Sequence, residues 1–190
     1  MNVLILCDRE SAGAVGFGLL EQTEKVAKQA GCEVRTVVLN GDETKPCVGC
    51  FSCWVKTPGL CIITNDSVTG VSRELMNADA VVILSKLTYG GFSIDVKAFL
   101  DRFIPNISPF FEIYHGEMHH KVRYERFPYW IAMGYGESTE EERETFRELA
   151  ERNALNMRPP KHFCLTPQNA DDCADALREF GRILTEEVAA

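Results

Sequence analysis

The sequence has no long hydrophobic run and no cluster of basic residues. No apolar stretch approaches the roughly 20 residues of a membrane-spanning helix, and no basic residue precedes the short apolar run near the N-terminus, so we expect neither membrane insertion nor secretion. Acidic residues outnumber basic ones by 28 to 20, which disfavours nucleic-acid binding because phosphate neutralisation needs clustered Lys and Arg. We therefore expect a cytoplasmic protein whose partners are small molecules or other proteins.

Internal repeats, low-complexity tracts and linker-like stretches are also lacking, which leaves no sign of a domain boundary. The chain has 190 residues, of which 45% are hydrophobic and 25% charged, an ordinary composition for a globular protein with a full core. We predict one domain over residues 1–190. Two segments interrupt its regular pattern, a cysteine-rich loop at 46–62 and an aromatic insertion at 105–128.

Short apolar runs alternate with helical patterns along the chain, which is typical of βαβ units and a parallel sheet. The runs predicted as strands, most of them apolar enough to be buried on both faces, are residues 3–7, 34–39, 80–85, 129–133 and 162–165. Helices are predicted at residues 16–30, 66–77, 94–103 and 138–154, and from 171 or 172 onward. The sequence thus predicts a three-layer α/β fold with a five-stranded sheet.

Four of the eight cysteines lie within fifteen residues, and they are Cys47, Cys50, Cys53 and Cys61. Three thiols at three-residue steps can converge on one centre while a fourth arrives from a short loop, which suits an iron-sulfur cluster. Zinc also accepts four thiolates, and a C-x-x-C pair can cycle as a disulfide or carry no metal. The cysteines indicate electron transfer, and a cluster, redox-active or unligated thiols, and zinc all remain open.

Three loops follow predicted strands at the end of the sheet where ligands bind. In an open parallel sheet the ligand crevice lies beyond the carboxyl ends of the strands, and the loops at residues 8–15, 86–93 and 134–137 meet that description. The second loop offers backbone flexibility at Gly90 and Gly91 and an aromatic face at Tyr89, which suits a flat heterocycle. An ordinary glycine turn would produce the same sequence.

The segment at 105–128 contains eight aromatic or histidine residues without a clear period. We predict a subunit contact, because exposed aromatic clusters mark interaction surfaces, and keep a lid or a wall of the substrate pocket as alternatives. His115 and His119 have a spacing that can bind a metal on a helix. Gly116 weakens such a helix, so solvated or hydrogen-bonded histidines are favoured.

The chain resembles the flavodoxin-like NAD(P)H-dependent FMN reductases, especially the iron-sulfur flavoproteins and related quinone reductases. The resemblance covers almost the whole chain and rests on the opening strand and loop and on the motifs PCVGCFSCW, NADAVVILSKLTYGG and SIDVKAFLDRF. It implies a flavodoxin-like, doubly wound sheet of order 2-1-3-4-5 and bound FMN. It also implies a homodimer or homotetramer that completes each site from a neighbouring subunit.

The resemblance further implies a set of FMN-binding residues. The FMN phosphate would lie at the N-terminus of the first helix, where exposed amides favour an anion, surrounded by Arg9, Ser11, Gly13, Ala14 and Val15. The isoalloxazine ring would be bordered by Leu87, Thr88, Tyr89, Gly90, Gly91, Gly134, Tyr135 and Gly136. The first loop departs from the family pattern, because its acids Asp8 and Glu10 would repel a phosphate that they faced. Arg9 could compensate for one of them.

The activity implied is that of an FMN-dependent oxidoreductase that passes electrons from NAD(P)H to a quinone, flavin or protein acceptor. A [4Fe-4S] cluster on the four cysteines is an optional second centre, within reach of the flavin in one subunit or across a dimer contact, because the cysteine loop follows the second strand. The flavin would carry the chemistry, so no catalytic side chain is assigned. Two alternatives remain, a non-enzymatic electron carrier and a cofactor-free binding module on the same fold.

Overall fold

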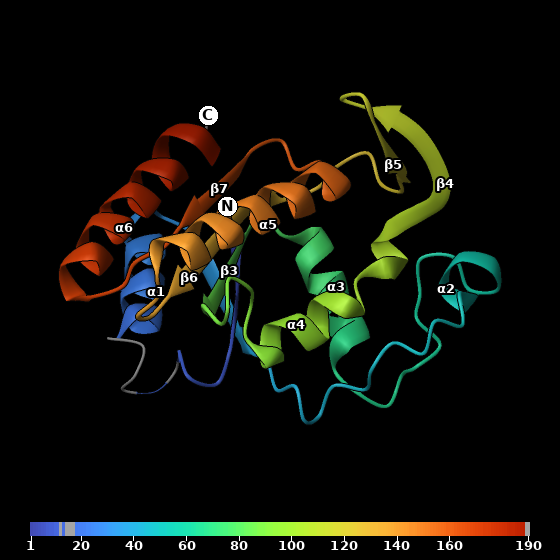
Figure 1. The fold of residues 1–190 in the computed structure, drawn as a ribbon, viewed down its shortest axis with the longest axis horizontal. Coiled ribbons are helices and arrows are strands. Elements are labelled where there is room, and N and C mark those ends of the chain that lie inside the picture. The colour runs from blue at the N-terminus through green and yellow to red at the C-terminus, as the bar shows by residue number, and fades with distance from the viewer. Residues whose placement is uncertain (12, 14–17, 189–190) are drawn as a thin grey trace.

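The structure is a computed structural model that describes residues 1–11, 13 and 18–188. These residues form a five-stranded parallel sheet of order β2-β1-β3-β6-β7 (Figure 1). Its strands are β1 (Asn2–Cys7), β2 (Glu33–Val38), β3 (Ala80–Lys86), β6 (Tyr129–Tyr135) and β7 (His162–Leu165). When these five strands are numbered by chain order alone, the sheet reads 2-1-3-4-5, so the predicted flavodoxin-like topology is confirmed.

The central strands are buried on both faces because alternate side chains enter two separate cores. On β3, Val81 and Ile83 belong to one cluster, whereas Val82 and Leu84 belong to the other. The first cluster lies under α3 (Val68–Asn77), α4 (Ile94–Asp101) and α5 (Glu140–Met157). The second lies under α1 (Leu19–Gln29), α6 (Ala170–Arg182) and the π-helical turn η3 (Ile183–Val188). The predicted three layers follow from this division.

Helices α5 and α6 each follow a residue whose side chain caps the helix. The capping box of α5 is formed by Thr139 and Glu142, whose side chains each accept a hydrogen bond from the other's backbone amide, at 3.2 and 2.9 Å. Helix α6 is capped by Asn169, whose side chain accepts from the amides of the two aspartates that follow. Both capping residues lie just before the first helical residue, where the backbone is extended.

The aromatic segment forms an antiparallel hairpin, which sequence analysis did not predict. Strand β4 (Ile107–Tyr114) pairs with β5 (Glu117–Val122), and the turn between them consists of His115 and Gly116, both with positive φ. His119 therefore lies on a strand, where its ring contacts Glu117 and Asn156, and the helical metal-binding spacing does not arise. Figure 1 shows the hairpin beside the C-terminal end of α5 and outside the main sheet.

Contacts with α5 and with the cysteine-rich loop hold the hairpin in place. Arg158, which follows α5, donates to Glu112 at 2.7 Å and lies 3.9 Å from the centre of the Tyr114 ring. Helix α2 (Ser52–Val55) carries Trp54, whose indole donates to two backbone carbonyls, one in the 3₁₀ turn η2 (Ile104–Asn106) and one at the start of β4. The two irregular segments of the sequence are thus packed against each other. The helices of the described chain are all too short or too polar to cross a lipid bilayer.

Candidate functional site

A cleft of about 750 Å³ opens at the carboxyl ends of β1 and β3, beside the start of α4 and α5. It lies where the strand order reverses, between β1 and β3, which is where ligands bind in this topology. Its volume is within the range of small-molecule sites. Its wall is formed by Asp8, Arg9, Glu10, Lys86, Leu87, Thr88, Tyr89, Ser93, Ile94, Asp95 and Glu142. Four of the predicted flavin-binding residues are among them.

Asp8 anchors the inner end of this cleft. Its side chain is 1% exposed, and its carboxylate accepts hydrogen bonds from the backbone amides of Ser11 and Lys86 and from the Tyr135 hydroxyl, at 2.9, 2.6 and 2.7 Å. Burial and the nearby Asp8 carboxylate raise the pKa of Tyr135, which keeps the phenol protonated as a donor. Asp8 thereby joins the carboxyl ends of three neighbouring strands, and protein donors satisfy its charge.

The other charges of the first loop are also paired. Arg9 binds Asp95 through Nε and Nη2, at 3.0 and 2.9 Å, and Asp42 through Nη1 at 2.8 Å. Burial raises the pKa of Asp95, but hydrogen bonds from Arg9 and from the amide of Gly41 more than offset this, so the net pKa is lowered. Glu10 pairs with Lys86 at 2.7 Å. Arg9 thus neutralises carboxylates of its own chain.

The predicted phosphate residues come together at the end of β1, but their donors are used within the loop. The Ser11 hydroxyl donates to the carbonyl of Asp8 at 2.6 Å, and the amide of Gly13 donates to the carbonyl of Glu10 at 3.0 Å. Ala14 and Val15 lie outside the described residues. The phosphate contact therefore stays a prediction. Whether the cleft suits FMN is judged from the turn that would lie against the isoalloxazine ring.

That turn follows β3 and is tight. Thr88 and Gly91 exchange two backbone hydrogen bonds of 2.9 Å, and Tyr89 and Gly90 both have positive φ, as a two-residue hairpin turn requires. The Tyr89 side chain is 92% exposed. A Cβ on Gly90 would lie 2.8 Å from Thr145, so glycine is required by space as well as by φ. The cleft volume and the exposed aromatic side chain fit the isoalloxazine part of a flavin.

The third predicted loop is shorter than expected, because strand β6 continues to Tyr135 and so includes Gly134 and Tyr135. A Cβ on Gly134 would lie 2.7 Å from the Phe146 ring, so this glycine allows α5 to pack closely on β6. Tyr135 is fully buried, and Gly136 has a φ of 103° and donates to the carbonyl of Pro167. Within the described chain these three residues stand outside the cleft wall, and their contact with a ring stays a prediction.

Sequence analysis missed Ile94, Asp95 and Glu142 as cleft residues, whereas Lys86 lies in a loop that it placed at the ligand crevice. Asp95 is inside the SIDVKAFLDRF motif, and the two residues before it, Ser93 and Ile94, also line the cleft, so the motif itself carried a signal. Glu142 comes from the first turn of α5, which is distant in sequence.

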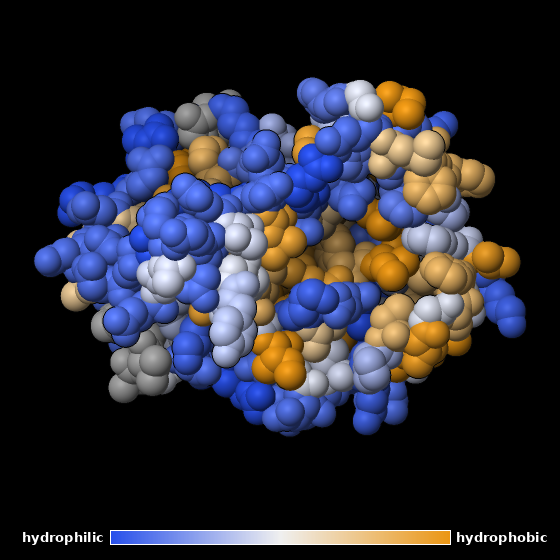
Figure 2. Space-filling view, in the orientation of Figure 1, coloured by the Kyte–Doolittle hydropathy of each residue, from blue (hydrophilic) through white to orange (hydrophobic). Residues whose placement is uncertain are grey.

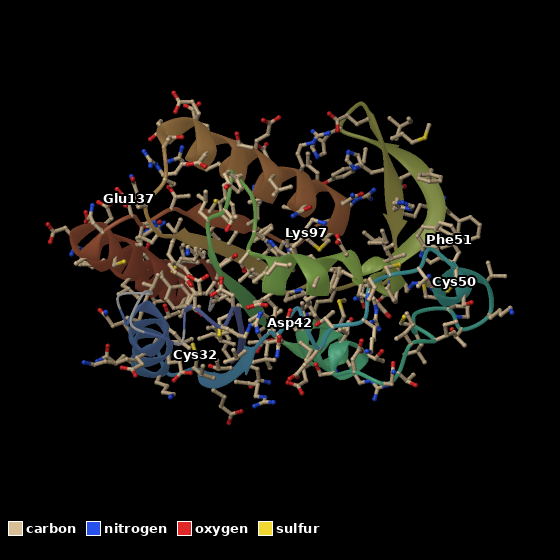
Figure 3. The ribbon with its side chains drawn as sticks, turned by 60° about the horizontal axis from the view of Figure 1, so that its bottom comes forward. Cys32, Asp42, Cys50, Phe51, Lys97 and Glu137 are labelled. Atoms are coloured by element: carbon tan, nitrogen blue, oxygen red, sulfur yellow. The ribbon has the colours of Figure 1, made fainter. Side chains whose placement is uncertain are left out.

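The four clustered cysteines line one pocket of about 20 Å³, together with Phe51 and Arg102. Burial raises the pKa of Cys53, and the neighbouring Cys61, Cys50 and Cys47 thiols raise it further. The pKa of the exposed Cys50 is lowered by hydrogen bonds from the amide and hydroxyl of Ser52. Figure 3 shows Cys50 and Phe51 beside α2, at the end of the molecule opposite Glu137, which follows β6.

The four thiols that share this pocket are suitable ligands for an iron-sulfur cluster, but they are not positioned around a common metal site. In the described part of the chain, no three His, Cys, Asp or Glu side chains are grouped so as to hold a metal. A cavity of about 20 Å³ has room for roughly one water molecule. The thiols would have to rearrange to hold a cluster, so the pocket in its present form does not fit one.

Comparisons with known proteins agree with the fold and with the position of the cleft. The model of the NADPH-dependent FMN reductase family matches residues 1–124 of the 190. An iron-sulfur flavoprotein of Methanocaldococcus jannaschii is 30% identical over 87 residues, which are 46% of this chain and 44% of that protein. The chain thus spans less than half of that relative in the matched region.

Solved structures share the fold at low identity. An NAD(P)H:quinone oxidoreductase from Methanothermobacter marburgensis superposes with a TM-score of 0.67 at 16% identity, over 97% of this chain and 94% of that one. An FMN-dependent NADH-azoreductase from Bacillus anthracis in complex with FMN superposes with a TM-score of 0.58 at 14% identity, over 100% and 98% of the two chains. The fold, the position of the cleft and the family match lead to one conclusion: this chain belongs to the NADPH-dependent FMN reductase family.

Proposed function

We propose that this protein is an FMN-dependent oxidoreductase that takes electrons from NAD(P)H at the cleft beyond β1 and β3. The observation that carries the proposal is the exposed Tyr89 on a strained, space-restricted turn at the switch point of the sheet. Family membership supports the choice of FMN, and an FMN-bound azoreductase of the same fold is consistent with it.

The residues that would hold the ring are Leu87, Thr88, Tyr89, Gly90 and Gly91, and those that would hold the phosphate lie in the loop from Arg9 to Val15. When bound, FMN supplies the two-electron chemistry that links NAD(P)H to an acceptor. The chain itself positions and shields the ring. The Asp8 carboxylate fixes the backbone of the first two loops, and the Thr88–Gly91 hydrogen bonds fix the turn that carries Tyr89.

A second subunit completes the site in this proposal. The hairpin and the cysteine-rich loop expose large apolar side chains, and Figure 2 shows apolar residues gathered over α2 and the hairpin. The most exposed of them are Val48, Val55, Phe110, Phe111, Ile113 and Met118. Such surfaces are typical of interfaces, and we assign this one to the contact between subunits. Light scattering would test this, since a monomer contradicts it.

The finer proposal concerns the cysteines as an electron-transfer element that receives electrons from the flavin. A [4Fe-4S] cluster is supported by the similarity to an iron-sulfur flavoprotein and by the sequence spacing of the four thiols, and it requires their pocket to rearrange, because its present form does not fit one. Redox-active thiols are supported by the lowered pKa of Cys50. Iron and sulfide assays on anaerobically purified protein separate these two. Cys50→Ala should lose iron and keep FMN if a cluster is present, and unchanged iron would remove Cys50 from the ligand set.

The absorption spectrum of anaerobically purified protein, before and after acid release of flavin, tests the main proposal. Bound flavin together with steady oxidation of NADH or NADPH in the presence of a quinone or free flavin is the expected result. Bound flavin without turnover would favour the electron carrier. A colourless protein that takes up no added FMN would overturn the proposal and favour a cofactor-free module.

A further inference from the structure

A second cavity, of about 320 Å³, lies along α3 and shares no described lining residue with the cleft at β1 and β3. Its other walls come from the end of the cysteine-rich loop, at Gly59–Cys61, from the region of η2, and from the chain that leads into β6, at Tyr124 and Arg126. Nothing in the proposed flavin chemistry uses this cavity. Its position and lining therefore call for a separate explanation.

One face of α3 lines the cavity. Thr69, Ser72, Arg73 and Met76 are spaced three or four residues apart, so they form a single stripe along the helix. The opposite face, with Val71 and Leu75, is buried in the core beneath the sheet. Three polar or charged side chains and one methionine of this stripe thus line the cavity, on a helix whose other side is fixed by packing.

Two side chains that line the cavity, Thr69 and Ser72, carry hydroxyl groups whose hydrogens have no acceptor within the described chain. The Thr69 Oγ1 atom is buried and has no hydrogen-bond partner within the described chain. The Ser72 Oγ atom accepts a hydrogen bond from Asn106 at 2.7 Å, and its own hydrogen remains available. A buried hydroxyl without a partner is unfavourable, and a ligand that accepts its hydrogen would remove this cost.

The charge of the cavity is positive in a protein of net charge -8. Three arginines line it, and among the described residues no aspartate or glutamate does. Asp66 neutralises Arg102, and Asp79 pairs with Arg126 through one nitrogen only. Arg73 has no ion-pair partner in the described structure and stands one residue after Ser72 at the exposed rim. The cavity therefore attracts anions.

Apolar side chains form the rest of the wall. Val68, Met76, Leu60 and Pro105 offer a hydrophobic surface next to the polar stripe. A small inorganic ion would leave this surface in contact with water, whereas an organic anion would cover it. Cys61 also lies in this wall and belongs to the four-cysteine pocket as well, so a ligand here would adjoin the thiols.

We propose that this cavity binds a small organic anion, whose carboxylate or phosphate lies between Arg73 and the hydroxyls of Thr69 and Ser72, and whose apolar body contacts Met76 and Leu60. The inference rests on the lining of the cavity alone, so it holds whatever the redox activity of the protein is. It assigns a recognition function to the exposed face of α3.

The test is a titration of the FMN-saturated protein with phenyl phosphate and with benzoate, followed through the amide chemical shifts of α3. Saturation with FMN occupies any flavin-phosphate site, so shifts along residues 69–76 report this cavity. Saturable shifts with either probe are expected, and the stronger probe distinguishes a phosphate from a carboxylate site. Inorganic phosphate should bind more weakly than phenyl phosphate. The absence of saturable shifts with both organic probes would overturn the proposal.

Variants give the test its specificity. Arg73→Gln should weaken binding about tenfold, the loss of one charge-assisted hydrogen bond. Thr69→Val should also weaken binding while leaving the melting temperature of the ligand-free protein unchanged or higher, because it removes an unpaired buried hydroxyl. Arg178→Gln, which removes an exposed arginine on α6, is the control and should bind like the wild type. Equal affinity in all three variants would contradict the assignment.

Discussion

Arg102 Nη1 lies 2.6 Å from Asp66 Oδ2 in an ion pair whose side chains are 0% and 3% exposed. Arg102 also donates to the backbone carbonyls of Lys45, at 2.7 Å, and Ile63, at 3.0 Å. These two carbonyls lie just before Cys47 and just after Cys61. One buried guanidinium therefore ties both ends of the cysteine-rich loop to the end of α4.

Replacing Arg102 should destabilise the protein strongly. Arg102→Met leaves the Asp66 carboxylate buried without its partner, which costs about 3–5 kcal/mol of unfolding free energy. Lys97→Met is the control on the same helix, because the pair of Lys97 with Asp101 is exposed and should cost less than about 1 kcal/mol. Urea unfolding measures both values, and equal values would contradict the role of Arg102.

The pH dependence of stability should reflect Asp66 and Asp95. Burial raises the pKa of each carboxyl, but hydrogen bonds from Arg102 and Arg9 respectively more than offset this, so both pKa values are lowered in the folded protein. Their contribution is therefore fully present above the unfolded pKa of about 3.9 and is lost as the pH falls from there through the folded pKa. Urea unfolding at several pH values should show stability falling below about pH 4. The fall should be smaller in Asp95→Asn, and an identical slope would refute this explanation.

Gly31 is a matched control for Gly90, which lies in the turn proposed to hold the flavin ring. Both have positive φ, but a Cβ on Gly90 would meet Thr145 at 2.8 Å, whereas a Cβ on Gly31 would meet nothing within 4 Å. Gly31→Ala should cost about 1–2 kcal/mol through backbone strain alone. Gly90→Ala should cost about 1–3 kcal/mol more through overpacking and should weaken FMN binding. Flavin titration of both variants checks this, and equal FMN affinity would disprove a role of the turn in flavin binding.

Cys50 should be the most reactive thiol of the metal-free, reduced protein. Hydrogen bonds from the amide and hydroxyl of Ser52 lower the pKa of Cys50, so a larger fraction of this thiol is ionised at neutral pH than of a buried cysteine. Its side chain is also exposed to the reagent. Burial raises the pKa of Cys7 to about 11, which makes Cys7 the slow reference. Iodoacetamide labelling followed by mass spectrometry should rank Cys50 far above Cys7, and Ser52→Ala should slow Cys50. Labelling of Cys50 at the rate of Cys7 would rule this out.

The centre of the main sheet was predictable because β1, β3 and β6 are nearly continuous apolar runs, and such runs are typical of strands buried on both faces. The hairpin was not, because β4 and β5 lie outside the main sheet and leave Phe110, Phe111 and Met118 exposed. Without a buried face, no alternation of apolar and polar residues marks a strand. The turn between the strands is also atypical, since His115 rather than Asn or Asp precedes Gly116.

By itself, the sequence determined the order of the five main-sheet strands and of the long helices that connect or follow them, the family and the density of thiols near Cys50, because periodicity and motif spacing are local properties of the chain. Only the tertiary structure decided how charges meet. Asp8 and Tyr135 are 127 residues apart in the chain, and Arg9 and Asp95 are 86 apart, yet each pair is in hydrogen-bond contact. Parallel strands bring such distant residues to one edge of the sheet, and a hydrogen bond depends on that arrangement in space and not on spacing along the chain.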